Sequence, residues 1–321
     1  MKKFVAILLT LMLVLGVSAA YADAIFDHET ATIKKLYKLT NADTTSPAET
    51  FTLSQVGDGV VTDGDAAFAP HLGDITGASF TAGAATVDGL TGDITVALPE
   101  YDTVGVYKYT LKEFAGKTAG VAYYGNEITL VVTVVNGDNG KLRVAAVHTE
   151  GEGGQKSDTF TNTYSAGTLS VSKTVTGNLG DKDKYFEFKV TLTGEAGKTY
   201  GDSYRVTGGS YTTNPEVVTI VAGEEKEYTF MLKHDETISI ANLPYGVKYT
   251  VTETVADGYT TSATGDTGTI SAADATAAFT NNKNGSIDTG VTTENLPYVL
   301  LIGFVVLAGA ALLIKRKAHN N

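Results

Sequence analysis

The sequence predicts an all-β chain built from two β-sandwich domains in tandem. Residues 23–283 are rich in Thr, Val, Tyr and Gly, and short alternating runs are separated by turn clusters such as 57–59 and 136–140. No segment of this region has a clean helical period. The order of elements also repeats between residues 25–164 and 165–283. We therefore expect little helix and two homologous sandwiches.

The repeat is carried by four kinds of segment. Each half begins with a lysine-containing strand, continues with an aromatic strand and a tyrosine strand that ends in glutamate, and closes with Phe-Thr-Asn. The paired segments are 33–37 with 169–173, 51–53 with 185–188, 107–113 with 247–253, and 160–162 with 279–281. Since only 164–167 separates the copies, we expect domains at 23–164 and 165–283 that lie end to end.

Six polar residues of these segments share the parity of apolar neighbours. Side chains on a strand point alternately to the two faces of a sheet, so the six are expected to face the core. They are Lys35, Glu113 and Asn162 in the first half and Lys173, Glu253 and Asn281 in the second. Burying a lone lysine or glutamate is costly unless it is paired or neutralised. A set that occurs in both halves therefore needs an explanation.

Periodicity alone leaves two explanations open. One is a buried lysine-glutamate ion pair that is hydrogen-bonded by the asparagine. The other is an amide bond between the lysine amine and the asparagine carboxamide, catalysed by the glutamate. Apolar burial lowers the pKa of an amine and raises that of a carboxyl, so a neutral amine could attack. The acid could polarise the asparagine carbonyl and shuttle protons as ammonia leaves, and folding would bring the groups together.

The N-terminus has the order of features that is typical of exported proteins. A basic start precedes an apolar run at 4–17, and small residues follow. This order predicts a secretory signal peptide at 1–22, cleaved after Ala22 or Ala24. A membrane helix is the alternative, although the run is short for one.

The C-terminus predicts a membrane segment. Residues 296–314 carry no charge and are followed by the basic tail 315–317. A helix of this length rises about 28 Å, enough to cross the hydrocarbon core, and the tail would stay cytoplasmic. A buried helix of a soluble domain is the alternative. We expect the protein to touch a membrane only through this precursor segment.

The composition excludes several classes of function. The chain has no cysteine, so any covalent stiffening must come from chemistry other than disulfides. A formal net charge of −12 argues against binding to nucleic acid. The five histidines lack metal-ligand spacing, and no G-x-S-x-G or P-loop motif occurs. We expect no cofactor, no metal and no enzyme activity on an external substrate.

The chain resembles the backbone (major) pilins of Gram-positive sortase-assembled pili, whose isopeptide-forming domains are immunoglobulin-like and of the CnaB type. The resemblance covers nearly the whole chain. It rests on the strand entry 243–249, on the E-box-like segment 249–259, on 45–51 and on both Phe-Thr-Asn strands. The E-box-like segment is one residue short, with Asp257 near the place of the usual proline.

The resemblance implies roles for the six core-facing residues. It implies a Lys35–Asn162 isopeptide bond catalysed by Glu113. In the same way, it implies a Lys173–Asn281 bond catalysed by Glu253.

The resemblance also implies a sorting signal and a polymerisation lysine. Sortase would cleave the pentapeptide 286–290 between Thr289 and Gly290 and hold the Thr289 carbonyl as a thioester. This pentapeptide retains only the Thr-Gly of the LPxTG pattern. Lys156, in the loop 153–157, resembles the lysine that accepts the next subunit. An ordinary exposed lysine is the alternative, because no Tyr-Pro-Lys motif is present.

The implied protein is the structural shaft subunit of a cell-wall pilus on a Gram-positive bacterium. Its implied partners are pilin-polymerising and housekeeping sortases, identical subunits in a covalent homopolymer, minor pilins and peptidoglycan. A monomeric wall-anchored adhesin or a minor pilin of the same fold is the alternative. Such a protein would share the signal peptide, domains and tail but would not need Lys156.

Overall fold

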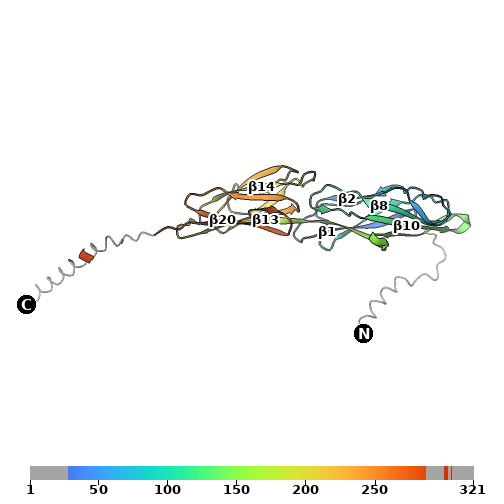
Figure 1. Cartoon of the computed structure of the whole chain (residues 1–321), viewed down its shortest axis with the longest axis horizontal. Helices are drawn as coiled ribbons and strands as arrows, with labels where there is room; N and C mark the ends of the chain where they lie inside the picture. The colour runs from blue at the N-terminus through green and yellow to red at the C-terminus, as the bar shows by residue number, and fades with distance from the viewer. Residues whose placement is uncertain (1–27, 287–299, 303–304, 306–321) are drawn as a thin grey trace, which may run out of the picture.

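The computed structural model describes residues 28–286, 300–302 and 305. From 28 to 286 the chain is almost entirely β-strand, broken by the short 3-10 turns η1 (Asp138–Gly140) and η2 (Glu152–Gly154). The predicted all-β class is therefore confirmed. Figure 1 shows two lobes that lie end to end, with the ends of the described segment at opposite tips.

The expected signal peptide at 1–22, the sorting pentapeptide beyond Ser286 and most of the segment 296–314 lie outside the described residues. Within the part of the chain that the structure describes, no helix is long and apolar enough to cross a membrane.

The first lobe consists of two main sheets and a small third one. The orders are β5-β7-β1-β12-β9 and β11-β10-β8-β3, with β4 also on β8 and with β2 paired to β6. Its strands are β1 (Thr30–Leu39), β2 (Glu49–Phe51), β3 (Leu53–Gln55), β4 (Val60–Gly64), β5 (Ile75–Thr76), β6 (Ala78–Phe80), β7 (Leu90–Ala97), β8 (Gly105–Glu113), β9 (Val121–Ala122), β10 (Glu127–Asn136), β11 (Leu142–Glu150) and β12 (Thr159–Tyr164).

The second lobe consists of two sheets, ordered β16-β15-β18-β13-β22-β20 and β17-β14-β19-β21. Its strands are β13 (Ala166–Thr176), β14 (Phe186–Thr193), β15 (Tyr204–Gly208), β16 (Val217–Val218), β17 (Glu225–Leu232), β18 (Glu236–Pro244), β19 (Lys248–Glu253), β20 (Thr260–Thr264), β21 (Thr267–Thr269) and β22 (Asp274–Asn282).

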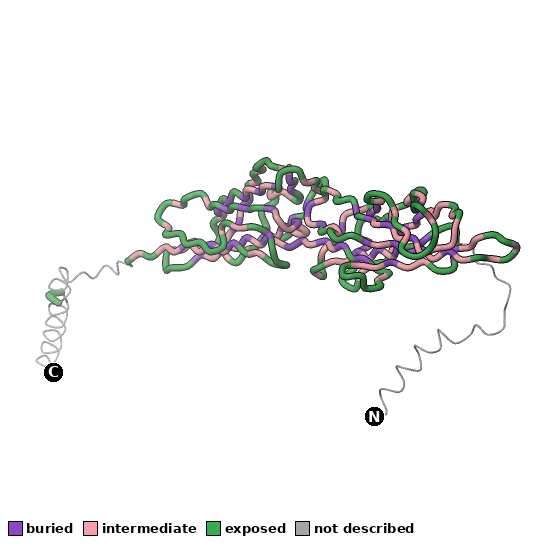
Figure 2. Tube along the Cα trace, turned by 45° about the vertical axis from the view of Figure 1, so that its right-hand side comes forward, coloured by how far each residue is buried: buried purple, intermediate pink, exposed green. Residues whose placement is uncertain are grey.

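Each lobe encloses a hydrophobic core between its main sheets, and Figure 2 shows the buried stretches running along the inside of both. Alternate residues of the long strands are buried, as the period of two requires. Tyr37, Phe51 and Phe80 pack their rings together in the first core, and Phe188 meets Phe279 edge-on in the second.

The first and last strands of each lobe lie side by side and run parallel. β1 pairs with β12, and β13 pairs with β22, whereas every other ladder between named strands is antiparallel. A parallel pair cannot be joined by a short hairpin, so each lobe is closed by strands from its two ends. This closure brings residues from opposite ends of each half together.

The continuous aromatic strand expected at 51–53 is wrong in detail, because Thr52 separates two strands. β2 pairs with β6 in the small sheet, while β3 pairs with β8 in a main sheet. The Thr52 carbonyl still accepts a hydrogen bond from the Phe114 N–H (3.1 Å). Phe51 and Leu53 are both buried, so the predicted core-facing parity holds.

The junction between the lobes is short and hydrogen-bonded. Only Ser165 separates β12 from β13. Asn242 has a positive φ of 60°, which asparagine tolerates better than most residues, and its amide pairs with both backbone groups of Thr45. The two distances are 2.9 Å from the Thr45 N–H to Oδ1 and 3.0 Å from Nδ2 to the Thr45 carbonyl. The backbone of Thr199 adds two hydrogen bonds, to Lys117 and Ala119.

Candidate functional site

Each lobe holds one fully buried lysine on its first strand. Lys35 on β1 and Lys173 on β13 are each 1% exposed. Both point inward because they share the parity of buried neighbours such as Ile33 and Val171, as the sequence predicted. An unpaired ammonium in such surroundings would be strongly unfavourable.

The register of the parallel pairs places an asparagine beside each lysine. Lys35 is opposite Phe160, and Asn162 lies two residues further along β12 on the same face. The second lobe repeats this register, since Lys173 is opposite Phe279, two residues before Asn281 on β22. Both asparagines are fully buried. The lysine and the asparagine are thus diagonal neighbours on the core side of the sheet in both lobes.

The glutamate reaches each site from the opposite sheet. Glu113 is the last residue of β8, and its side chain forms a buried ion pair with the Lys35 amine through Oε2. Its other oxygen, Oε1, accepts a hydrogen bond from Asn162 Nδ2 at 2.5 Å. One carboxylate therefore bridges the two nitrogen atoms, one on each oxygen.

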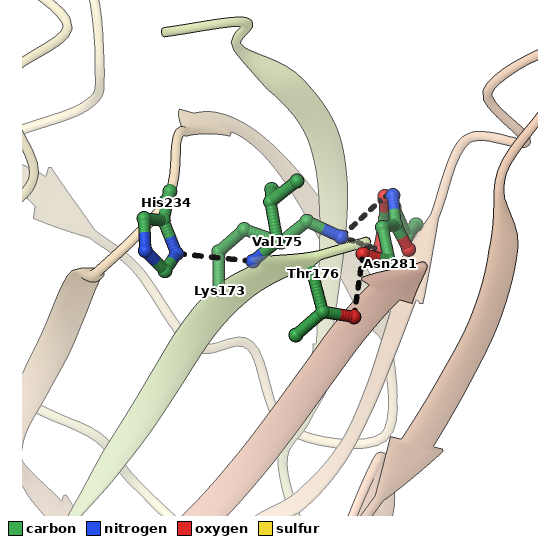
Figure 3. A network of polar contacts seen from close by, with 6 residues as sticks. Lys173, Val175, Thr176, His234 and Asn281 are labelled. Carbon is green, nitrogen blue, oxygen red and sulfur yellow. Dashed lines mark hydrogen bonds and ion pairs between the residues drawn. The ribbon is translucent and has the colours of Figure 1, made fainter. Parts of the chain in front are cut away.

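The second site has the same three residue types in a similar arrangement. Lys173 Nζ lies 2.8 Å and 2.7 Å from the two oxygens of Glu253, the last residue of β19. Asn281 Nδ2 donates to Glu253 Oε1 at 2.5 Å. Figure 3 shows the Lys173 side chain extending from its strand toward Asn281 on the neighbouring strand. The nearby His234 is occupied by the backbone, because the Val175 N–H donates to its Nδ1 at 3.1 Å.

Aromatic rings enclose both amines. Lys173 Nζ lies 4.3 Å from the ring centre of Phe186, and Lys35 Nζ lies 5.4 Å from that of Phe51. Burial lowers the pKa of both lysines below the ordinary 10.5, and the hydrogen bond and charge of the neighbouring glutamate oppose this shift only in part. A lower pKa favours the neutral amine, which is the nucleophilic form.

One contact of the first site differs from expectation. Glu113 was expected to polarise the Asn162 carbonyl, but its oxygens contact the two nitrogens. The carbonyl oxygen, Oδ1, instead accepts a hydrogen bond from the backbone N–H of Tyr124 at 2.9 Å. Sequence reasoning missed this group, since every residue except proline has a backbone N–H and no pattern marks one.

Of the residues expected to act between subunits, the structure describes only Lys156. Lys156 is exposed, follows η2 and pairs through an isolated bridge with Glu150. It lines a cavity of about 530 Å³ together with His28, His148 and Asp158. Lys156 is therefore an exposed loop residue, whereas Lys35 and Lys173 are buried. Thr289 and Gly290 lie outside the described residues.

Comparison with known proteins finds pilus proteins. A family model described as a Spy0128-like isopeptide containing domain matches residues 31–165, and a domain of unknown function matches 167–283. The chain is 32% identical over 237 residues to a pilin of Streptococcus pyogenes serotype M1, which spans 68% of this chain and 69% of that protein.

Two further relatives bear on the comparison. The crystal structure of the major pilin from Streptococcus pyogenes superposes with a TM-score of 0.54 at 25% identity, covering 81% of this chain and all of that one. The pilus tip adhesin Cpa of Streptococcus pyogenes is 35% identical over 133 residues, but this covers 39% of the present chain and 18% of the adhesin. The match to the major pilin thus extends over both lobes, whereas the match to the adhesin is partial.

Proposed function

We propose a mechanism for this chain, which belongs to the major-pilin family with a Spy0128-like isopeptide-containing domain. The chain is the shaft subunit of a cell-surface pilus. Each lobe, 23–164 and 165–283, is an immunoglobulin-like domain of the CnaB type. Each closes a lysine-asparagine isopeptide bond on folding. The protein is structural, and its chemistry is limited to these reactions within its own chain.

In the first domain the neutral Lys35 amine attacks Cγ of Asn162. The π electron pair of the carbonyl moves to Oδ1, and a C–N bond forms. Glu113 takes the proton that the Lys35 nitrogen loses and delivers one to Nδ2, since one of its oxygens contacts each nitrogen. The Cγ–Nδ2 bond breaks, ammonia leaves and an amide remains. Lys173, Glu253 and Asn281 take the same roles in the second domain.

The observation that carries this proposal is the repetition of one geometry at two places. In both lobes a parallel pair of first and last strands sets the asparagine two residues beyond the position opposite the lysine. In both lobes a glutamate from the other sheet contacts both nitrogens. An ion pair that the asparagine hydrogen-bonds is the alternative, and the mass of the chain separates the two.

Export and assembly use the ends of the chain. The signal peptide at 1–22 is removed, and the segments 296–314 and 315–317 hold the precursor in the membrane. A pilin-polymerising sortase cleaves after Thr289 and transfers its carbonyl to Lys156 of another copy. A housekeeping sortase joins the finished fibre, with its minor pilins, to peptidoglycan.

The intact mass of the purified chain without its terminal segments tests the intramolecular bonds. We expect the loss of two ammonia molecules relative to the translated sequence, one per lobe. A mass equal to that of the plain polypeptide would show that the buried residues form ion pairs only.

Assembly is tested separately in wall extracts. Lys156→Ala should abolish the ladder of covalent polymers, while Lys141→Ala, which removes another exposed lysine of the same lobe, should leave it intact. A ladder that survives Lys156→Ala would assign polymerisation to a different lysine. A single anchored band from the unaltered chain would favour a monomeric adhesin or minor pilin.

A further inference from the structure

The segment after β9 directs a backbone N–H toward the first site. β9 pairs with β12 only at Thr163 and Tyr164, and the chain then leaves the sheet. Because it leaves there, the N–H of Tyr124 is free of the ladder and donates to Oδ1 of Asn162 at 2.9 Å. A longer contact of 3.3 Å joins the same N–H to Glu113 Oε1.

The second site lacks this donor because its strands pair differently. β20 runs along β22 through the asparagine itself, with Thr261 opposite Asn281. Its backbone groups are used by the ladder and lie in the plane of the sheet. Within the described residues, the buried Oδ1 of Asn281 has no hydrogen-bond partner.

We propose that the Tyr124 N–H is an oxyanion donor for the first isopeptide reaction, a catalytic group that the second site does without. This inference rests on the proposed isopeptide function. When the Lys35 amine adds to Cγ, the carbonyl π pair becomes a full lone pair on Oδ1, and the oxygen becomes negative. A donor that is already at hydrogen-bond distance strengthens as that charge develops and lowers the barrier.

The position of the donor divides the chemistry between two groups. Both carboxylate oxygens of Glu113 are taken by the two nitrogens between which protons must pass, so the carboxylate serves as the proton relay. The Tyr124 N–H contacts the remaining reacting atom, Oδ1 of Asn162. The Tyr124 ring packs against Phe160 and lies 5.5 Å from Lys35 Nζ, which holds this segment against the site.

The test replaces the amide N–H by an ester oxygen and leaves the side chain unchanged. The α-hydroxy analogue of tyrosine is placed at position 124 during cell-free synthesis. Samples are quenched in acid at intervals and digested, and the cross-linked peptides of each site are quantified by mass spectrometry. The closure rate of the second site in the same molecule is the internal control for changes in the folding rate.

The ester should slow closure of the Lys35–Asn162 bond by about 100-fold, which is the usual effect of removing one oxyanion donor. Closure of the Lys173–Asn281 bond should keep its rate. Tyr124→Ala, which keeps the N–H and removes the ring, should slow the first bond far less than the ester does.

Two results would overturn the inference. One is an ester chain that closes its first bond at the rate of the unaltered chain. The other is an equal slowing of both bonds, which would place the effect in folding. If the unaltered chain yields no cross-linked peptide from either site, the isopeptide function itself fails, and this result is distinct from the other two.

Discussion

The two lobes bring together the same three residue types, lysine, glutamate and asparagine, in surroundings that differ. In the first, the asparagine carbonyl accepts a hydrogen bond from Tyr124, and Lys35 contacts one oxygen of its glutamate. In the second, the carbonyl oxygen has no partner among the described residues, and Lys173 contacts both oxygens of Glu253. The difference comes from the strand next to the asparagine, which is short in the first lobe and continuous in the second.

This comparison separates what the proposed reaction needs from what differs between the two sites. The shared part is a buried amine, a carboxylate that touches both nitrogens and a diagonal register between parallel strands. Backbone donors and aromatic neighbours vary around this shared part, and they should set the rate at which each bond forms.

The largest effect should come from removing one of the two proposed catalytic glutamates. Glu113→Ala and Glu253→Ala should each leave a folded chain that retains one ammonia, in its own lobe only. Losing a cross-link across such a long loop should lower the free energy of unfolding of that lobe by about 4 to 5 kcal/mol, by analogy with disulfides. Intact mass and urea unfolding measure the two effects.

The matched controls are Glu127→Ala and Glu225→Ala, which remove exposed glutamates from the first and second lobes. Both should keep the mass and unfolding midpoint of the unaltered chain. Normal ammonia loss in Glu253→Ala would mean that the second bond forms without its glutamate.

The next effect is the pH dependence of stability in a second lobe whose isopeptide bond cannot form. In Asn281→Ala, Lys173 remains an amine, and burial holds its pKa below the ordinary 10.5. The unfolded chain then binds more protons than the folded one between the two pKa values, so stability should rise as pH increases through this window toward 10.5. Below the folded-state pKa, the full penalty for burying the ammonium applies.

Urea unfolding of the second lobe at several pH values measures this slope. The unaltered chain is the control, because its Lys173 nitrogen would be an amide and would not titrate in this range. Parallel pH profiles for the two chains would contradict the proposed bond.

A smaller effect is expected from the aromatic ring beside the Lys173 amine. Phe186→Leu keeps apolar volume next to Lys173 but removes the ring that faces its amine. Water can then approach, the lysine pKa should rise toward its ordinary value, and each pKa unit regained reduces the neutral amine about tenfold. The time course of the second cross-linked peptide should lengthen while that of the first stays the same. Equal time courses in Phe186→Leu and the unaltered chain would show that the ring is not needed.

The smallest effect is expected at the junction. Asn242→Ala removes two hydrogen bonds to Thr45 and places alanine at a positive φ, which should cost about 1 to 3 kcal/mol in the contact between the lobes. Both isopeptide bonds should still form. Small-angle scattering should report a wider spread of lobe angles, and Asn242→Gly separates the loss of the hydrogen bonds from the backbone strain. An unchanged scattering profile would place the rigidity in the Ser165 linker instead.

Local periodicity predicted much of this structure because a strand repeats every two residues. Lys35, Lys173 and Asn162 are buried as their parity required, and the tyrosine strand ends in an inward-facing Glu113. These predictions needed only the chain near each residue.

Features that depend on distant pairing could not be predicted in this way. The parallel register of β1 with β12 joins the two ends of a lobe, and no local pattern encodes it. The break at Thr52 arises because β2 and β3 pair with different partners. The Tyr124 contact depends on where β9 leaves the sheet, which is a property of the loop path and not of the side chain.

The one-residue junction has a mechanical consequence for a fibre under tension. With intersubunit links at Lys156 and Thr289, as proposed, the covalent load path enters at the start of β12 and crosses Ser165 into β13. It passes from Lys173 to Asn281 through the second amide and leaves along the end of β22. This load path is a short covalent connection along one side of the subunit.

Most of the chain would lie outside this load path and bear no tension. The Lys35–Asn162 bond lies off the route, so it would protect the first lobe against heat and proteolysis, whereas the Lys173–Asn281 bond would carry the pull. A pilus missing the first bond should therefore keep its length under force, and one missing the second should stretch as its second lobe unravels.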